Sequence, residues 1–73
     1  MDIGRAIKEI AYEKRMTQAD LCRATGIGDS WMSQMFRSKI TDPQVLRVYA
    51  ICKALGVSID DLVALADKYE DAK

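Results

Sequence analysis

A glycine-containing turn, Thr25-Gly26-Ile27-Gly28, separates two helical patterns that are each only about two turns long. The first pattern, residues 17–24, begins with a threonine whose hydroxyl can cap free backbone amides, and Asp20 sits three residues on in a capping-box arrangement. Gly26 can take the left-handed backbone conformation that ends this helix and turns the chain sharply. The second pattern covers residues 29–36. Two short helices joined by a glycine turn and held between other helices form a helix-turn-helix arrangement.

Three further helical patterns flank this turn. Isoleucines at three- and four-residue steps predict a first helix over residues 2–14. Asp42-Pro43 provides an N-cap and a proline at the first helical position for a fourth helix that runs over residues 44–55. A fifth helix, near residues 58–67, opens with a serine and has an aspartate three residues on. The chain is therefore predicted to be all-α, a five-helix bundle whose helix-turn-helix occupies residues 17–36.

The predicted core combines the apolar stripes of these helices. Met32 and Met35 are expected to face inward and to hold the third helix against the first and fourth. Cys22 and Cys52 occupy helical positions that alanine can fill, which indicates small, reduced core residues. With no secretory signal or long apolar run in the sequence, we expect a cytoplasmic protein that does not enter a membrane. The buried stripe of the fourth helix is predicted to be Val45, Val48, Tyr49, Cys52 and Leu55.

Size and composition limit the possible functions. The 73 residues, 49% apolar and 30% charged, suit one globular core, so residues 1–73 are predicted to form a single domain. The sequence has no histidine, no paired carboxylates in a plausible cleft, no phosphate-cradling glycine loop and no metal cluster. We therefore expect neither an enzyme nor a cofactor or metal site.

The charge distribution bears on a nucleic-acid partner. A net charge of zero argues against one, because neutralising phosphates needs local positive charge. However, residues 1–40 carry seven basic and five acidic side chains, a balance of +2, and residues 41–73 carry four basic and six acidic ones, a balance of −2. Such a division lets a face formed by the basic residues 1–40 approach DNA. The acidic residues 41–73 can then favour solubility or bind a partner.

Three segments carry a resemblance to a known family: Lys14-Arg15-Met16-Thr17-Gln18-Ala19-Asp20-Leu21, residues 25–33, and residues 53–62. Their order and spacing resemble the phage repressor and Cro-like helix-turn-helix proteins, which include restriction-system controller proteins and many antitoxins. The resemblance implies a five-helix, lambda-repressor-like DNA-binding domain that binds palindromic operators as a two-fold dimer. It covers most of residues 3–65.

The resemblance also implies roles for individual residues. Gln18 matches a glutamine that contacts phosphate and supports a recognition-helix side chain, and Arg37 and Lys39 fall where relatives place loop residues on phosphates. The chain departs from the pattern at Gly28, where Ser or Thr is usual, and at Phe36, which replaces a commonly polar residue. Its loop after the third helix is also one residue longer. The positions that match groove-facing ones are Asp29, Ser30, Ser33 and Gln34.

The chemistry of the third helix fits base recognition. Gln34 can pair bidentately with adenine, Asp29 can accept from the amino group of cytosine, and the serines can bond several base edges or phosphates. Arg37, at the end of the helix, can reach either a guanine or a phosphate. Trp31 borders the two faces of the helix and either covers the edge of the core or touches the sugar-phosphate backbone. The alternative to base recognition is that these are ordinary solvated residues on a surface helix. The predicted DNA-binding residues are Thr17, Gln18, Asp29, Ser30, Trp31, Ser33, Gln34, Arg37 and Lys39.

Other basic side chains near the second helix have two interpretations. Lys14, Arg15 and Arg23 either contact phosphates, which positions a protein without giving sequence preference, or are simply solvated.

Helix five carries more apolar residues than one stripe needs, which predicts a dimer contact that places two copies of helix three one DNA turn apart, roughly 34 Å. A monomer with a generous core is the alternative. The leading hypothesis is a repressor that binds double-stranded operator DNA as a homodimer. The rival is an antitoxin or anti-regulator module whose main partner is another protein. The predicted dimer residues are Ile59, Leu62, Val63, Leu65 and Ala66.

Overall fold

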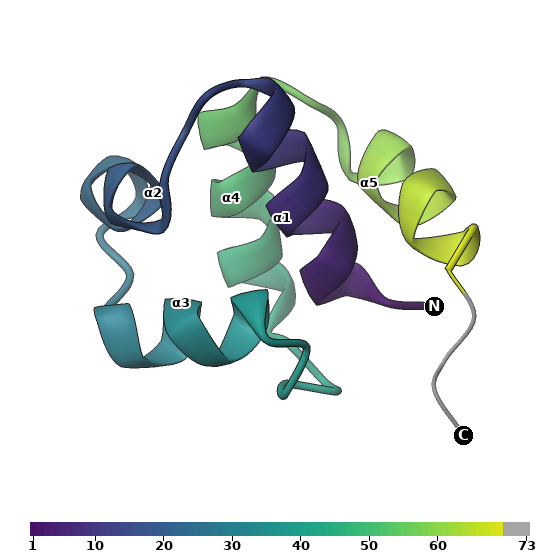
Figure 1. Ribbon diagram of the computed structural model, residues 1–73, viewed down its shortest axis with the longest axis horizontal. Coiled ribbons are helices and arrows are strands. Elements are labelled where there is room, and N and C mark those ends of the chain that lie inside the picture. The colour runs from purple at the N-terminus through teal and green to yellow at the C-terminus, as the bar shows by residue number, and fades with distance from the viewer. Residues whose placement is uncertain (70–73) are drawn as a thin grey trace.

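The computed structural model describes residues 1–69, and this part of the chain is all-α. Its five helices confirm the predicted fold class (Figure 1). The helices are α1 (Ile3–Glu13), α2 (Gln18–Thr25), α3 (Asp29–Phe36), α4 (Val45–Leu55) and α5 (Ile59–Asp67). None of the helices within residues 1–69 is long and apolar enough to cross a membrane.

Helices α1 and α4 form the centre of the bundle, with α2 and α3 on one side and α5 on the other (Figure 1). Helix α3 lies across the lower end of α1, and its backbone approaches α1 and α2 rather than α4. The start of the chain is tied to the end of α5, because the Asp2 N–H donates to the Ala66 carbonyl at 3.2 Å. The third helix is thus supported from behind and open on its far side.

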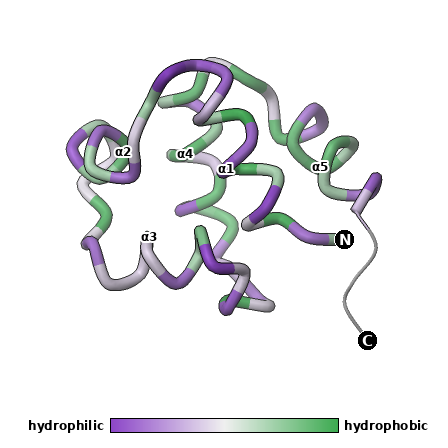
Figure 2. The backbone as a smooth tube through the Cα atoms, viewed as in Figure 1, coloured by the Kyte–Doolittle hydropathy of each residue, from purple (hydrophilic) through white to green (hydrophobic). Residues whose placement is uncertain are grey.

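The core takes apolar residues from all five helices. Apolar and hydrophilic residues are interleaved along the helices, as amphipathic packing requires (Figure 2). Met32 and Met35 are both fully buried, which confirms the predicted core role of the two methionines. Burying one such side chain contributes about 1.5–3 kcal/mol. The largest fully buried side chains are Ile7, Leu21, Met32, Met35, Ile51, Leu62 and Cys52.

Local capping fixes the ends of the two short helices. The Asp20 N–H donates to Thr17 Oγ1 at 3.1 Å and the Thr17 N–H donates to Asp20 Oδ2 at 2.9 Å, so the predicted capping box is present. Gly26, with φ of 75°, ends α2 in the left-handed conformation that the sequence indicated. These two devices set where the turn between α2 and α3 begins.

The first turn of α4 differs from the prediction. Gln44 is the N-cap, so Asp42 and Pro43 precede the helix instead of starting it. Val45 is 68% exposed and Tyr49 is 51% exposed, so the prediction that they are buried is wrong.

The physical reason is the register of the helix. The buried residues of α4 form a stripe with i, i+3, i+4 and i+7 spacing, and at 100° per residue Tyr49 lies roughly 110° from its centre. Ile51, which the sequence interpretation left out, takes that place in the core. The stripe is Val48, Ile51, Cys52 and Leu55.

Helices α1 and α3 approach each other closely at Gly4, and no local sequence pattern predicts this contact. A Cβ atom on Gly4 of α1 would lie 2.1 Å from the Met35 carbonyl oxygen and 3.0 Å from Ser38 Oγ. Just past α3, Ser38 has a left-handed φ of 58° and its hydroxyl donates to Asp2 Oδ1 at 2.6 Å. This bond, together with one from the Arg5 N–H, lowers the pKa of the Asp2 carboxyl. Gly4 and Asp2 therefore fix the end of α3 on the start of α1.

Candidate nucleic-acid interface

The outward face of α3 is polar. Asp29, Ser30, Gln34 and Arg37 are exposed and Ser33 is half-buried, as the 100° step of the helix places them. The structure thus brings the predicted base-reading residues onto one side of α3, opposite the two buried methionines.

Two half-buried aromatic residues border this outward face. Trp31 packs against the core on the α4 side, as its predicted core-edge position requires, and the Arg47 guanidinium lies 5.1 Å from the centre of its ring. Such a contact holds a cation over an aromatic face while leaving most guanidinium N–H groups free to donate. Sequence reasoning missed Arg47, because its partner Trp31 belongs to a different helix and no local spacing links the two.

Phe36 borders the other edge, beside α1. It lines a shallow surface groove together with Arg5, Lys8, Tyr12 and Arg37, and with the acidic residues Asp2 and Glu9. Tyr12 is 84% exposed. Cationic side chains therefore stand on both flanks of α3, which is the arrangement a helix needs when it lies between two phosphate backbones.

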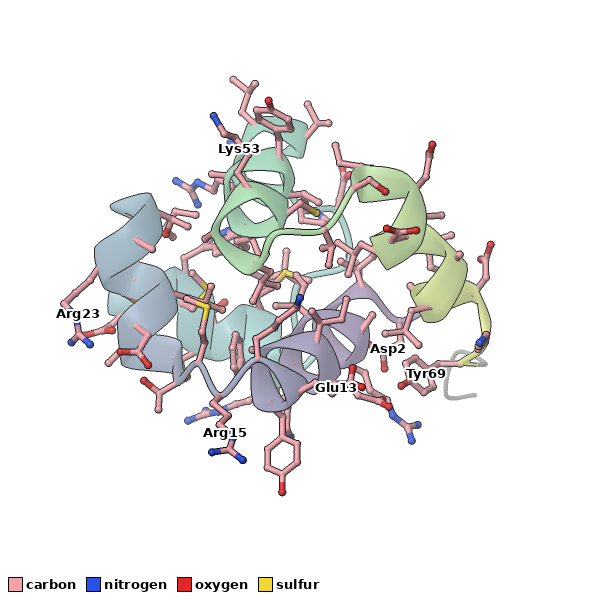
Figure 3. All side chains as sticks on the ribbon, turned by 90° about the horizontal axis from the view of Figure 1, so that it is seen from above. Asp2, Glu13, Arg15, Arg23, Lys53 and Tyr69 are labelled. Atoms are coloured by element: carbon pink, nitrogen blue, oxygen red, sulfur yellow. The ribbon has the colours of Figure 1, made fainter. Side chains whose placement is uncertain are left out.

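The start of α2 offers a separate group of polar residues. Gln18 is half-buried, and Thr17 is exposed with its hydroxyl oxygen already accepting the capping bond. Arg15 and Arg23 point outward from the turn before α2 and from α2 itself (Figure 3). Arg23 forms an ion pair with Asp20, so its charge is partly offset, whereas Arg15 adopts a left-handed φ of 59° at the end of α1.

The end of α3 carries the remaining predicted contacts. Arg37 caps the helix, and Lys39, which is exposed, follows Ser38. The Lys39 N–H donates to the Gln34 carbonyl at 2.9 Å, which closes the last turn of α3. Both basic side chains are thereby held near the C-terminal end of the outward face.

Cys22 packs against the core as predicted, but it is not a fully buried core residue. It is half-buried, and its thiol Sγ donates to Asp29 Oδ1 at 3.1 Å, across the turn from α2 to α3. Desolvation and then this bond to Asp29 raise the pKa of the Cys22 thiol. Cys52 is buried as predicted, and burial raises the pKa of its thiol. Gly28, the N-cap of α3, gives no side-chain hydrogen bond, so the thiol is what links the start of α3 to α2 through a side chain.

The predicted dimer residues are not all available for a contact between protomers. Leu62 and Ala66 are fully buried in the protomer's own core, because α5 packs against α1 and α4. Ile59, Val63 and Leu65 are half-buried. Of the large hydrophobic side chains exposed within residues 1–69, three lie together on α4, Val45 at 68%, Leu46 at 78% and Tyr49 at 51% exposure, and the others are Met1 and Tyr12. We name Val45, Leu46 and Tyr49 the α4 apolar face.

No group of three or more His, Cys, Asp or Glu side chains placed to hold a metal ion occurs within residues 1–69. Comparison with protein families gives one informative result: a family model described as a Cro/C1-type HTH DNA-binding domain matches residues 6–68. No curated protein and no solved structure matches the chain.

Proposed function

The chain belongs to the Cro/C1-type helix-turn-helix DNA-binding domains, and from that premise we propose that it is a sequence-specific transcriptional repressor that binds a palindromic operator as a homodimer. The observation that carries the proposal is the outward face of α3, which is polar, exposed and bordered by cations on both flanks. In this proposal α3 enters the major groove and the residues at its edges contact the two phosphate backbones.

Base recognition is assigned to the centre of that face. Gln34 offers an amide that can pair with N6 and N7 of adenine, and Asp29 offers a carboxylate that can accept from the N4 amino group of cytosine. Ser30 and Ser33 are short donors and acceptors that suit either base edges or phosphates. Trp31, with one side on the core, supports the helix and presents its edge to the sugar-phosphate backbone.

Phosphate contacts are assigned to the margins: Thr17 and Gln18 at the start of α2, Arg37 and Lys39 at the end of α3, and Arg47 beside Trp31. Contacts of this kind set the register on the duplex and carry no base preference. Since the whole chain has no net charge, non-specific attraction to DNA is weak. Specific affinity must therefore come from base contacts and from pairing two protomers on one site.

The contact with the second protomer is assigned to the α4 apolar face. Contact between these large apolar side chains and water is unfavourable. A two-fold contact removes this patch from water in both copies. Lys53, which lies over Tyr49, points away from α1 (Figure 3), and the backbones of α3 and α4 do not approach each other closely. A contact through the α4 apolar face therefore leaves the outward face of α3 open. The half-buried Ile59 and Val63 of α5 can extend the contact at its margin.

Selection of bound duplexes from a random double-stranded DNA pool tests the repressor proposal. We expect a palindrome whose half-sites lie about one helical turn, roughly 34 Å, apart. Selection of an asymmetric single half-site would contradict the homodimer, and failure to select any sequence would contradict DNA recognition itself.

Sedimentation tests the surface assigned to the dimer. Leu46→Lys should shift the protein toward monomer, with and without the selected duplex, because it places a charge in the centre of the contact. Ala64→Lys on α5, which adds the same charge at an exposed position outside the α4 apolar face, serves as the matched control. A wild-type protein that stays monomeric both alone and on DNA would remove the dimer.

A second candidate function is an antitoxin or anti-regulator module whose main partner is another protein. The α4 apolar face and the zero net charge favour it. In that case Leu46→Lys abolishes capture of the partner protein, and no DNA sequence is enriched in the selection.

A further inference from the structure

We propose that Cys22 is a positioning residue for base recognition: its thiol holds the Asp29 carboxylate in the orientation that reads one base pair. The inference rests on the proposed function, in which α3 enters the major groove. It adds to that function a specificity determinant that lies on α2, outside the helix that reads the bases.

The geometry at the start of α3 makes an external support necessary. Asp29 is the first residue of the helix and is exposed, so its short side chain has solvent on its outer side. The preceding residue, Gly28, has no side chain, and a Cβ there would meet nothing within 4 Å. Within residues 1–69, the one side-chain hydrogen bond to the Asp29 carboxylate is that from Cys22 Sγ, at 3.1 Å. This bond therefore selects the carboxylate orientation.

The bond from Cys22 leaves the Asp29 carboxylate able to accept a further hydrogen bond from a base. An ionised carboxylate has two oxygens and about four acceptor positions, so one bond at Oδ1 leaves Oδ2 open toward a groove. A cytosine amino group is a donor and suits that oxygen, whereas guanine and thymine present acceptor atoms that it repels. An oriented Asp29 therefore discriminates by attraction to cytosine and by repulsion of guanine and thymine. Adenine also carries an amino donor, at N6, so the orientation of the carboxylate is what separates cytosine from adenine.

The thiol suits this role better than its small size suggests. Burial and the neighbouring Asp29 raise the pKa of Cys22, which keeps the sulfur protonated and hence a donor at neutral pH. The hydrogen bond also stabilises the ionised form of Asp29, which lies on the side of the molecule that faces the phosphates in this proposal. Because the donor belongs to α2, the same bond couples the helix assigned to phosphate contact with the start of the reading helix.

Alkylation tests the contact without DNA. We expect Asp29→Asn to raise the rate at which iodoacetamide modifies Cys22 by at least about twofold, since removing the carboxylate lowers the pKa of the thiol. Peptide mapping separates Cys22 from Cys52, whose rate should stay low because it is buried. An unchanged Cys22 rate in Asp29→Asn would overturn the contact and with it the proposal.

Base preference tests the consequence. The probe is the duplex that the wild-type protein selects, with each base pair of a half-site changed in turn. We expect Asp29→Asn to lower discrimination at one base pair by about tenfold, and Cys22→Ala to lower it at the same base pair by about threefold. Cys22→Ser, which restores a donor, should recover the preference. Arg23→Ala, an exposed neighbour on α2, is the matched control and should leave every base preference unchanged.

The possible results separate the inference from the function on which it rests. If Asp29→Asn alters one base pair and Cys22→Ala alters none, Asp29 reads DNA and Cys22 does not position it. If Cys22→Ala weakens binding equally at every base pair, its role is structural and the inference is wrong. The same conclusion follows if Cys22→Ala lowers the free energy of unfolding by as much as it lowers the free energy of binding. If the wild-type protein selects no sequence, the proposed function fails, and the inference fails with it.

Discussion

The two faces of α3 are built on opposite principles. The inward face is packed against the rest of the bundle: Met32 and Met35 are fully buried, and the Met35 carbonyl comes so close to Gly4 that no Cβ fits between them. The outward face makes few contacts of its own: within residues 1–69, its one side-chain hydrogen bond is that from Cys22 to Asp29. The helix is thus fixed in place from behind so that its front remains free to bind.

This difference separates stability from recognition. A change on the inward face should alter the free energy of unfolding, whereas a change on the outward face should alter DNA affinity and leave unfolding nearly unchanged. The following substitutions test that separation, and the largest expected effect comes first.

Gly4→Ala should lower the free energy of unfolding by about 2 kcal/mol. Overpacking costs up to about 3 kcal/mol, and the upper end applies to a Cβ only 2.1 Å from a carbonyl oxygen, whereas the better helix propensity of alanine returns about 1 kcal/mol. The added Cβ meets a backbone carbonyl, which cannot rotate away as a flexible side chain can. Urea unfolding measures the effect. Stability equal to that of the wild type would show that α1 and α3 are less tightly joined than the structure indicates.

Gln34→Ala should lower affinity for the selected duplex by about tenfold, which corresponds to the loss of one bidentate base contact. Its urea midpoint should match that of the wild type, because Gln34 is exposed and its side chain makes no hydrogen bond to any of residues 1–69. Fluorescence anisotropy with a labelled duplex measures the affinity. A fall in stability as large as the fall in affinity would break the proposed separation.

Arg47→Ala should weaken binding by about threefold on every sequence and make the salt dependence of binding shallower by about one counterion. The reason is the loss of a phosphate contact that Trp31 holds at the edge of α3. Lys68→Ala is the matched control, since Lys68 is exposed and caps α5, on the other side of the bundle from α3. Equal salt slopes for Arg47→Ala and the wild type would exclude Arg47 from the interface.

Gly28→Ser should raise the free energy of unfolding by about 0.5 kcal/mol. The backbone at Gly28 has φ of −68° and ψ of 154°, which serine adopts readily, and its hydroxyl can cap an amide of α3 that now lacks a side-chain partner. Open space surrounds the new Cβ. Thermal unfolding measures the gain. A loss of stability would mean that the start of α3 needs glycine for a reason that the structure does not show.

Asp2→Asn should have the smallest effect, and one that depends on pH. Bonds from Ser38 and Arg5 lower the pKa of the native Asp2 carboxyl, so their contribution is complete above the ordinary value of about 3.9. The contribution is lost as pH falls through the lowered native pKa. The wild type should therefore be slightly more stable than Asp2→Asn at pH 7, and the difference should vanish in acid. A difference independent of pH would contradict this.

The sequence was informative wherever the cause of a structure is local. The capping box at Thr17 and Asp20 and the left-handed Gly26 need only neighbouring residues, and the bounds of α3 were predicted to the residue. The close approach between α1 and α3 was not predicted, because nothing near Gly4 in the sequence indicates that the Met35 carbonyl will approach it.

The candidate site shows the same division. Helical spacing placed the exposed residues of α3 on one side, and it placed the methionines in the core. It assigned Cys22 to the core and passed over Arg47, because the partners of both residues lie on another helix. The pattern of α4 was ambiguous, since apolar residues surround most of its first turns and periodicity alone cannot say which of them a neighbouring helix covers.

The central claim is that the outward face of α3 docks on DNA, and Trp31 reports on it directly because it is the only tryptophan in the chain and lies at the edge of that face. The measurement is tryptophan emission during titration with the selected duplex, beside a scrambled duplex of equal length. We predict a saturable change with the selected duplex and a far weaker one with the scrambled duplex. Emission that stays flat while anisotropy of a labelled duplex shows binding would contradict the account, since DNA would then bind elsewhere on the molecule.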